Sequence, residues 1–115
     1  MMNSMATLRN SYGDLFITDC RLRDAAQVFA HKWDPLVLAV LTEGPLRREA
    51  LHRSLGTISD KSLTETLNRL MEWELVVRTR RLSAPPRVDY ALSDRGQSFV
   101  DGPLEALAKW IIATD

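Results

Sequence analysis

The sequence has only one cysteine and two histidines, and this shortage excludes several classes of protein. An intramolecular disulfide is excluded because Cys20 has no second cysteine to pair with, so a reducing cytoplasm is the expected location. His31 and His52 do not have the spacing of metal ligands. A Cys20–His31 catalytic pair would lack both an orienting third group and an oxyanion site. We therefore expect no enzyme, no metal and no cofactor.

Long apolar runs and an excess of one charge are also missing. The longest apolar run, residues 35–41, is far too short to cross a membrane, and the first 14 residues lack a signal-peptide pattern. The 15 basic residues balance 15 acidic ones, which excludes a uniformly basic nucleic-acid coat. Residues 44–95, however, contain ten basic and seven acidic side chains. A local excess is enough for phosphate contact, although charge alone is explained better by an ordinary solvated surface.

The sequence favours one domain, because 115 residues with 45% hydrophobic side chains can build a single core. Asp34 is a plausible N-cap for a short helix that is apolar on all sides, and Gly44-Pro45 ends that helix. Ser59 is a plausible N-cap for a longer helix. Apolar spacing and these caps predict helices over about 20–30, 36–41, 47–55 and 59–73.

After residue 73 the apolar pattern changes from helical to alternating, which indicates a pair of strands. One strand has Leu75, Val77 and Thr79 on a single face, and the other has Val88, Tyr90 and Leu92. The segment 83–86 between them contains two prolines and is therefore a loop. Ser93 is predicted to cap a last helix that Gly102-Pro103 kinks or breaks.

These elements, in this order, are the parts of a winged helix-turn-helix, a mostly α fold with a small β-hairpin wing. In such a module the second helix of the pair enters the major groove of DNA. The predicted organisation is an N-terminal arm over 1–19, a winged helix-turn-helix domain over 20–95 and a C-terminal dimerisation helix over 96–115.

Several residues also carry a resemblance to a known family. They are Cys20, Lys32-Trp33, Gly44-Pro45, Ile58-Ser59, the run from Pro85 to Ser93 with Gly96, and Trp110. With this spacing the chain resembles the HxlR family of bacterial winged-helix transcription regulators, in the MarR-like group. It departs from the family at Arg21, at Arg48, where an aromatic residue is usual, and at Ala50, where a glutamate is usual.

The resemblance implies a DNA-binding regulator and suggests a role for the cysteine. In several similar regulators the matching cysteine senses oxidants or electrophiles, so Cys20 is a candidate redox sensor. The alternative is a small buried residue that only packs its helix. Control by an oxidant or another small molecule is therefore an expectation of the resemblance.

The predicted contacts to double-stranded DNA lie on two elements. Basic side chains suit phosphate or guanine contact and Asn68 suits adenine, while the arginines beside the 83–86 loop suit phosphates or the minor groove. Arg78 is expected to pair with Glu74 or Asp89 instead. The candidate DNA-binding residues are Ser59, Lys61, Ser62, Thr64, Asn68 and Arg69 on the helix and Arg80, Arg81 and Arg87 on the wing.

The last helix has an apolar stripe that is too large to leave exposed on a small monomer. Its members are Leu104, Leu107, Trp110 and Ile111, and they predict a homodimer interface. Twofold symmetry then implies an inverted-repeat operator. The competing interpretation is a winged-helix module for protein–protein contact without DNA binding. Such a module would more often have acidic or apolar residues in place of the basic wing or the polar helix face.

Overall fold

The structure of the chain is a computed structural model that describes Arg23 and residues 26–114. It divides into two units, Met1–His31 and Lys32–Asp115. In the first unit, a 3-10 turn (η2) spans Gln27–Phe29 and Val28 is buried. The predicted arm, most of the predicted helix over 20–30 and Cys20 lie outside the described residues.

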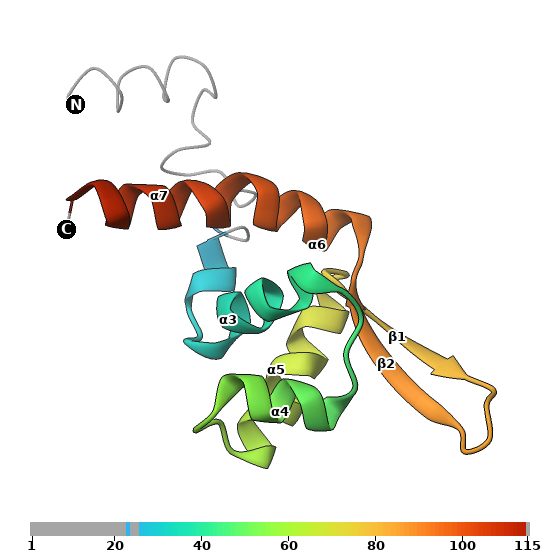
Figure 1. Ribbon diagram of the computed structural model, residues 1–115. Helices are drawn as coiled ribbons and strands as arrows, with labels where there is room; N and C mark the ends of the chain where they lie inside the picture. Colours follow the sequence, from blue (N-terminus) through green and yellow to red (C-terminus); the bar gives the residue numbers. More distant parts are fainter. Residues whose placement is uncertain (1–22, 24–25, 115) are drawn as a thin grey trace. The chain divides into compact units, whose positions relative to one another are not determined.

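Three helices build the centre of the second unit (Figure 1). They are α3 (Trp33–Val40), α4 (Arg48–Leu55) and α5 (Asp60–Glu72), and a short 3-10 turn, η3 (Leu41–Glu43), follows α3. Their apolar faces meet in a core with almost no solvent exposure. The core side chains of these helices are Val37, Leu38, Leu51, Leu63, Leu67 and Leu70.

Helix α3 differs in two ways from the prediction. It begins at Trp33, so Asp34 is not its N-cap but lies inside its first turn, where the side chain is buried. The helix is also not buried on all sides, because 42% of Leu36 is exposed. The Asp34 carboxylate is turned towards α5, and Leu36, about 200° further round the helix, lies on the opposite side.

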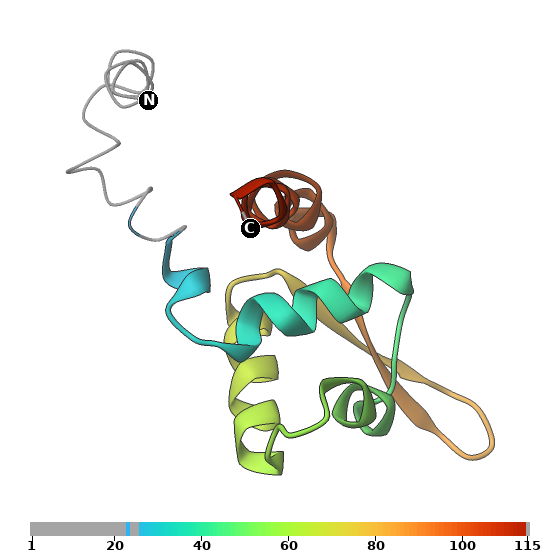
Figure 2. The same cartoon turned by 60° about the vertical axis from the view of Figure 1, so that its left-hand side comes forward.

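The turn between α4 and α5 confirms the predicted helix-turn-helix. Helix α4 ends at Gly56, whose φ of +69° lies in the left-handed region that favours glycine. Ser59 caps α5 as predicted, and its hydroxyl oxygen accepts a hydrogen bond from the backbone N–H of Ser62 at 3.0 Å. Figure 2 shows α4 and α5 on the same side of α3.

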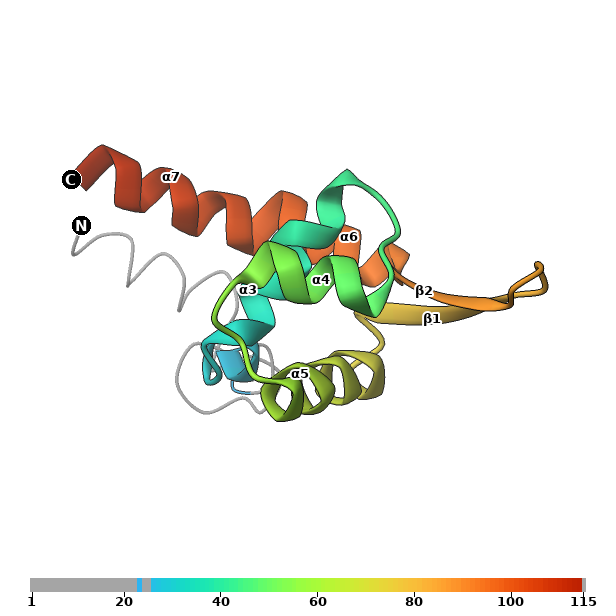
Figure 3. The same ribbon diagram turned by 60° about the horizontal axis from the view of Figure 1, so that its bottom comes forward.

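The wing is the predicted two-stranded antiparallel hairpin, formed by β1 (Val76–Arg81) and β2 (Arg87–Leu92). Val76 pairs with Leu92 and is buried, whereas 44% of Val77 is exposed. Val76 is the one buried residue of β1, and Val77 and Thr79 of the predicted face are exposed, while Leu75 is buried just before the strand. The hairpin projects away from the helices (Figure 3).

A long C-terminal helix follows the wing. It comprises α6 (Asp94–Phe99), a π-helical turn η4 (Val100–Leu104) and α7 (Glu105–Thr114). The α-helical pattern is interrupted at the predicted place, since the π turn contains Gly102 and Pro103, but the chain stays helical through it and does not break into two separate helices. Ser93 caps α6 as predicted, with its oxygen accepting from the Gly96 N–H at 2.9 Å. A Cβ at Gly96 would lie 2.0 Å from the Leu75 carbonyl oxygen, which makes glycine a requirement of this junction.

Candidate nucleic-acid interface

Helix α5 has one buried face and one polar, exposed face. Leu63, Leu67 and the side chain of Thr66 form the buried face, with at most 2% exposure. The opposite face presents three of the predicted DNA contacts, Lys61, Thr64 and Asn68. These three side chains belong to one surface because the buried leucines fix the rotation of the helix about its axis.

Two further predicted contacts on α5, Ser59 and Ser62, lie at the N-terminus of the helix. The Ser59 hydroxyl caps the helix, so its oxygen is engaged within the protein. Only the backbone N–H of Ser62 takes part in that cap, and the Ser62 side chain is half-buried. Of the two hydroxyl groups, that of Ser62 takes no part in the cap.

Arg69 is held inside the protein by Asp34. Its Nε and one terminal nitrogen donate to the two carboxylate oxygens of Asp34 at 3.0 and 2.8 Å, and that terminal nitrogen also donates to Thr66 at 3.2 Å. The Asp34 side chain is 5% exposed and that of Arg69 is 29% exposed. The hydrogen bond with Asp34 raises the pKa of the Arg69 guanidinium. This geometry favours a structural role, tying α5 to α3, over the predicted DNA contact.

Two of the predicted wing arginines share one carboxylate. Arg81 forms an ion pair with Asp89, and Arg87 lies 3.8 Å from the same carboxylate. One predicted partner of Arg78 was Asp89, and this prediction is wrong. The register places Arg78 opposite Tyr90, on the other face of the hairpin from Asp89. No described acidic residue, Glu74 included, forms an ion pair with Arg78.

Arg48, one of the departures from the family pattern, connects α4 to the start of α5. Its guanidinium donates to the backbone carbonyl of Asp60 at 3.0 Å and lies 3.7 Å from the Asp60 carboxylate. His52 lies 3.4 Å from that carboxylate as well. Asp60 stands at the N-terminus of the helix, where its charge would repel phosphate, and Arg48 partly compensates this charge.

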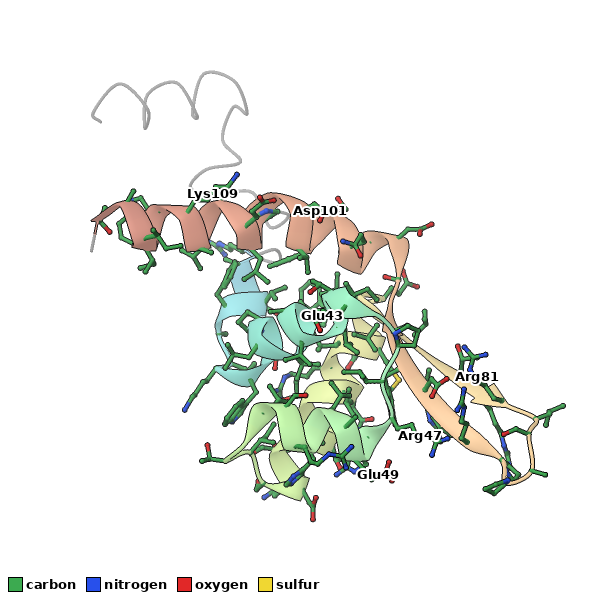
Figure 4. All side chains as sticks on the ribbon, viewed as in Figure 1. Glu43, Arg47, Glu49, Arg81, Asp101 and Lys109 are labelled. Atoms are coloured by element: carbon green, nitrogen blue, oxygen red, sulfur yellow. The ribbon has the colours of Figure 1, made fainter. Side chains whose placement is uncertain are left out.

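A groove between the start of α4 and the wing contains three arginines that the sequence did not indicate as DNA contacts, namely Arg47, Arg48 and Arg78. Arg47, which precedes α4, and Arg48 line one wall, and Arg78 and the predicted contact Arg80 line the other wall from β1. Figure 4 shows Arg47 and Glu49 at the end of α4 that faces the wing. In the sequence, the adjacent arginines at 47 and 48 were the one local indication of a basic site here. Their proximity to β1 follows only from the fold.

The apolar stripe of the last helix is exposed in the single chain. The exposed fractions are 43% for Leu107, 56% for Trp110 and 52% for Ile111, and Leu104 is half-buried. Ile112, which was not predicted as part of the stripe, is 76% exposed. No residue of α7 is buried.

In the described part of the chain, no group of three or more His, Cys, Asp or Glu side chains could hold a metal ion. None of the described helices is long and apolar enough to cross a membrane. His31 is exposed, and Cys20, with which a catalytic pair was considered and disfavoured, lies outside the described residues.

Comparison with known families and relatives agrees with this architecture. The family model described as HxlR-like helix-turn-helix matches residues 28–114. An HTH-type transcriptional regulator of Methanothermobacter thermautotrophicus is 35% identical over 91 residues, which cover 79% of this chain and 69% of the relative. The HTH-type transcriptional regulator YtfH of Escherichia coli is 33% identical over 99 residues, 86% of this chain and 78% of YtfH.

Solved structures show the same fold. The reduced form of the transcriptional regulator YodB from Bacillus subtilis superposes with a TM-score of 0.74 at 27% identity, covering 80% of this chain and 90% of YodB. A MarR-family transcriptional regulator from Porphyromonas gingivalis gives a TM-score of 0.73 at 28% identity, over 83% of this chain and 92% of that protein.

Proposed function

Because the chain belongs to the HxlR-like helix-turn-helix family of transcriptional regulators, we propose that it binds specific DNA sequences as a homodimer on an inverted-repeat operator. The observation that carries the proposal is the exposed polar face of α5 beside a basic wing. In this assignment α5 is the recognition helix, which reads base edges in the major groove, and the wing contacts the flanking backbone or minor groove.

The predicted contact residues of α5 divide into those proposed to contact bases and those that hold the helix in place. Lys61, Ser62, Thr64 and Asn68 are proposed to contact bases, because their side chains are free of the contacts that hold the helix in place. Ser59 and Arg69 support the helix, through its cap and through the Asp34 ion pair respectively.

On the wing, Arg80 is the most available of the three predicted contacts, since Arg81 and Arg87 share Asp89. A phosphate close to the wing tip would compete with Asp89 for these two guanidinium groups. We therefore keep Arg81 and Arg87 as proposed DNA contacts that exchange one anionic partner for another.

The proposed homodimer rests on α7. Its large apolar side chains, 43–76% exposed, have no cover from the described part of the second unit, and water contact with such a surface is unfavourable. A second copy of the same stripe is a suitable cover because a twofold interface is self-complementary. Two protomers also bring two recognition helices, which gives the length of readout that one short helix lacks.

Control by an oxidant or electrophile through Cys20 is a second part of the proposal. It is supported by the similarity to YodB, whose structures include a reduced form and a diamide-treated form, each 27% identical to this chain. Cys20 is the only thiol in the sequence, so a modified protein would carry the change there. Operator binding by wild type and by Cys20→Ser, before and after quinone treatment, tests this. Equal loss of binding in both proteins would contradict the role of Cys20.

Selection of bound sequences from a random duplex pool, at two salt concentrations, tests the central proposal. We expect an inverted repeat whose half-sites lie about one helical turn, or a multiple of it, apart. Asn68→Ala is expected to relax base preference at one position of each half-site, at about 1–3 kcal/mol per lost contact. Arg95→Ala on α6 is the control and should leave the selected sequence unchanged. Failure to enrich any sequence, together with weak and salt-insensitive binding, would favour a protein–protein module instead.

A further inference from the structure

The groove between α4 and the wing is lined by arginines from two separate elements. Its volume is about 590 Å³. Glu49 is the one carboxylate in its lining. The lining also contains five arginines: Arg47, Arg48, Arg78, Arg80 and Arg87. This is a far stronger local excess of positive charge than the chain as a whole has, since its net charge is zero.

The backbone holds the two walls of this groove in a fixed relation. Leu46 and Tyr90 exchange two backbone hydrogen bonds, of 2.9 and 2.8 Å, so the residue just before Arg47 is bonded directly to β2. The register of the hairpin places Arg78 opposite Tyr90 and Arg80 opposite Val88. Because alternate residues of a strand share a face, both arginines belong to the face of the wing that lines the groove.

The arginines of the groove differ in how far they are already paired. Arg48 is bonded to Asp60, and Arg87 lies near Asp89. Arg47, Arg78 and Arg80 are exposed and form no ion pair with any described residue. Three like charges around one groove repel one another, and an anion with several oxygens would relieve that repulsion.

We propose that this groove binds successive phosphates of one DNA strand, with Arg47, Arg78 and Arg80 as the contacts. This inference rests on the proposed function and adds to it a phosphate site between the start of α4 and the wing. The strand that separates a major groove from the next minor groove has to pass between an element in the first and an element in the second. Planar guanidinium groups match the paired oxygens of phosphate, so arginine is well suited to these positions.

Glu49 gives the proposal a second, opposite signature. Its carboxylate lines the same groove and would repel a phosphate there. Removing that charge should therefore strengthen binding, whereas removing an arginine should weaken it. A groove that did not face DNA would produce neither effect.

The neighbouring groove on the other side of the hairpin is a weaker candidate. It has a similar volume of about 610 Å³, but Arg81 and Arg87 in its lining are paired with Asp89, which also lines it. Its positive charge is therefore partly neutralised within the protein.

The test measures the affinity for the selected operator and for a scrambled duplex across a series of salt concentrations. Arg47→Ala and Arg78→Ala should each weaken binding to both duplexes alike. Each should also reduce the slope of log affinity against log salt by about 0.9. Glu49→Gln should raise the affinity for both duplexes. Arg95→Ala, an exposed arginine on α6, is the matched control, and unchanged melting temperatures show that each variant is folded.

The outcomes separate this inference from the proposed function. If wild type binds its operator and the Arg47→Ala/Arg78→Ala double variant keeps both affinity and slope, the groove is not a phosphate site although the protein binds DNA. If wild type binds no duplex, both proposals fail. A parallel titration uses tripolyphosphate without DNA. Saturable binding that the double variant loses, while its DNA affinity stays intact, would assign the groove to a free phosphate compound and overturn the DNA assignment.

Discussion

Helices α5 and α7 both carry an apolar stripe, but among the residues that the structure describes only the stripe of α5 is covered. Leu63 and Leu67 on α5 are at most 2% exposed, whereas Leu107 and Ile111 on α7 are 43% and 52% exposed. The same periodicity in the sequence thus leads to a core in one helix and to an open surface in the other. An apolar stripe shows that a helix needs a partner, and the fold shows whether that partner is in the same molecule.

The two helices also differ in how they are anchored. Helix α5 has a side-chain cap at its start and a bidentate ion pair with α3 near its end. Helix α7 continues from a π turn, and its one ion pair with a described residue, Lys109 with Glu105 at 3.1 Å, lies within the helix itself. Such an i,i+4 pair stabilises the helix only slightly and fixes no position relative to other elements.

The largest effect is expected from a leucine-to-alanine substitution in α5, and the same substitution in α7 serves as the comparison. Leu67→Ala should lower the free energy of unfolding by about 2–5 kcal/mol, because it leaves a cavity in the core. Leu107→Ala should cost less than about 0.5 kcal/mol in dilute solution, where the protein is monomeric. Denaturant unfolding measures both values.

Repeating the measurement at high protein concentration sharpens this comparison. The cost of Leu107→Ala should rise with concentration, because the substitution then also weakens the dimer. Leu67→Ala should show no comparable increase. A cost for Leu107→Ala that stays the same from dilute to concentrated protein would contradict the assignment of α7 to the interface.

The ion pair that anchors α5 should produce the next largest effect. Arg69→Met leaves the Asp34 carboxylate, only 5% exposed, without its partner, and is expected to destabilise the fold by about 3 kcal/mol. Thermal or denaturant unfolding measures the loss.

The matched control for this prediction is the double variant Asp34→Leu/Arg69→Met. With both charges removed, no unpaired carboxylate is left, and the stability should return to within about 1 kcal/mol of wild type. Operator affinity of the refolded double variant then reports how far the ion pair also orients α5. If Arg69→Met alone were as stable as wild type, the pair would not anchor the helix.

The smallest effect is expected at the start of α5, where two serines have different tasks. Ser59→Ala should cost about 1 kcal/mol of stability through loss of the cap. Ser62→Ala should leave stability almost unchanged and relax base preference, because only the backbone of Ser62 serves the cap. Unfolding and sequence selection on both variants separate the two roles. Equal loss of stability in both would contradict the division.

Local features of the sequence predicted most of the fold. The caps at Ser59 and Ser93 and the prolines of the 83–86 loop act on their immediate neighbours, so their effect can be inferred from the residues alone. Errors arose where two adjacent residues were equally suitable. Val76 and Val77 have similar side chains on opposite faces of the strand, and the packing of the hairpin against the rest of the fold decides which one is buried.

The partners of charged side chains were much harder to predict. Asp34 and Arg69 are 35 positions apart, and nothing local in either segment indicates that they meet. Asp34 was therefore assigned to a cap and Arg69 to DNA. The sequence did not predict two further ion pairs for the same reason, Arg48 with Asp60 and Arg81 with Asp89. An ion pair depends on how whole helices and strands pack together and not on the sequence neighbours of either charged residue.

The close approach of Gly96 to the Leu75 carbonyl oxygen restricts which substitutions can be accepted at position 96 during evolution. Every other amino acid brings at least a Cβ, which would lie 2.0 Å from a backbone oxygen that has no freedom to rotate away. Neighbouring Asp94 and Arg95 are exposed and free to vary. Among descendants of this chain that still fold, position 96 should remain glycine while the positions just before it diverge.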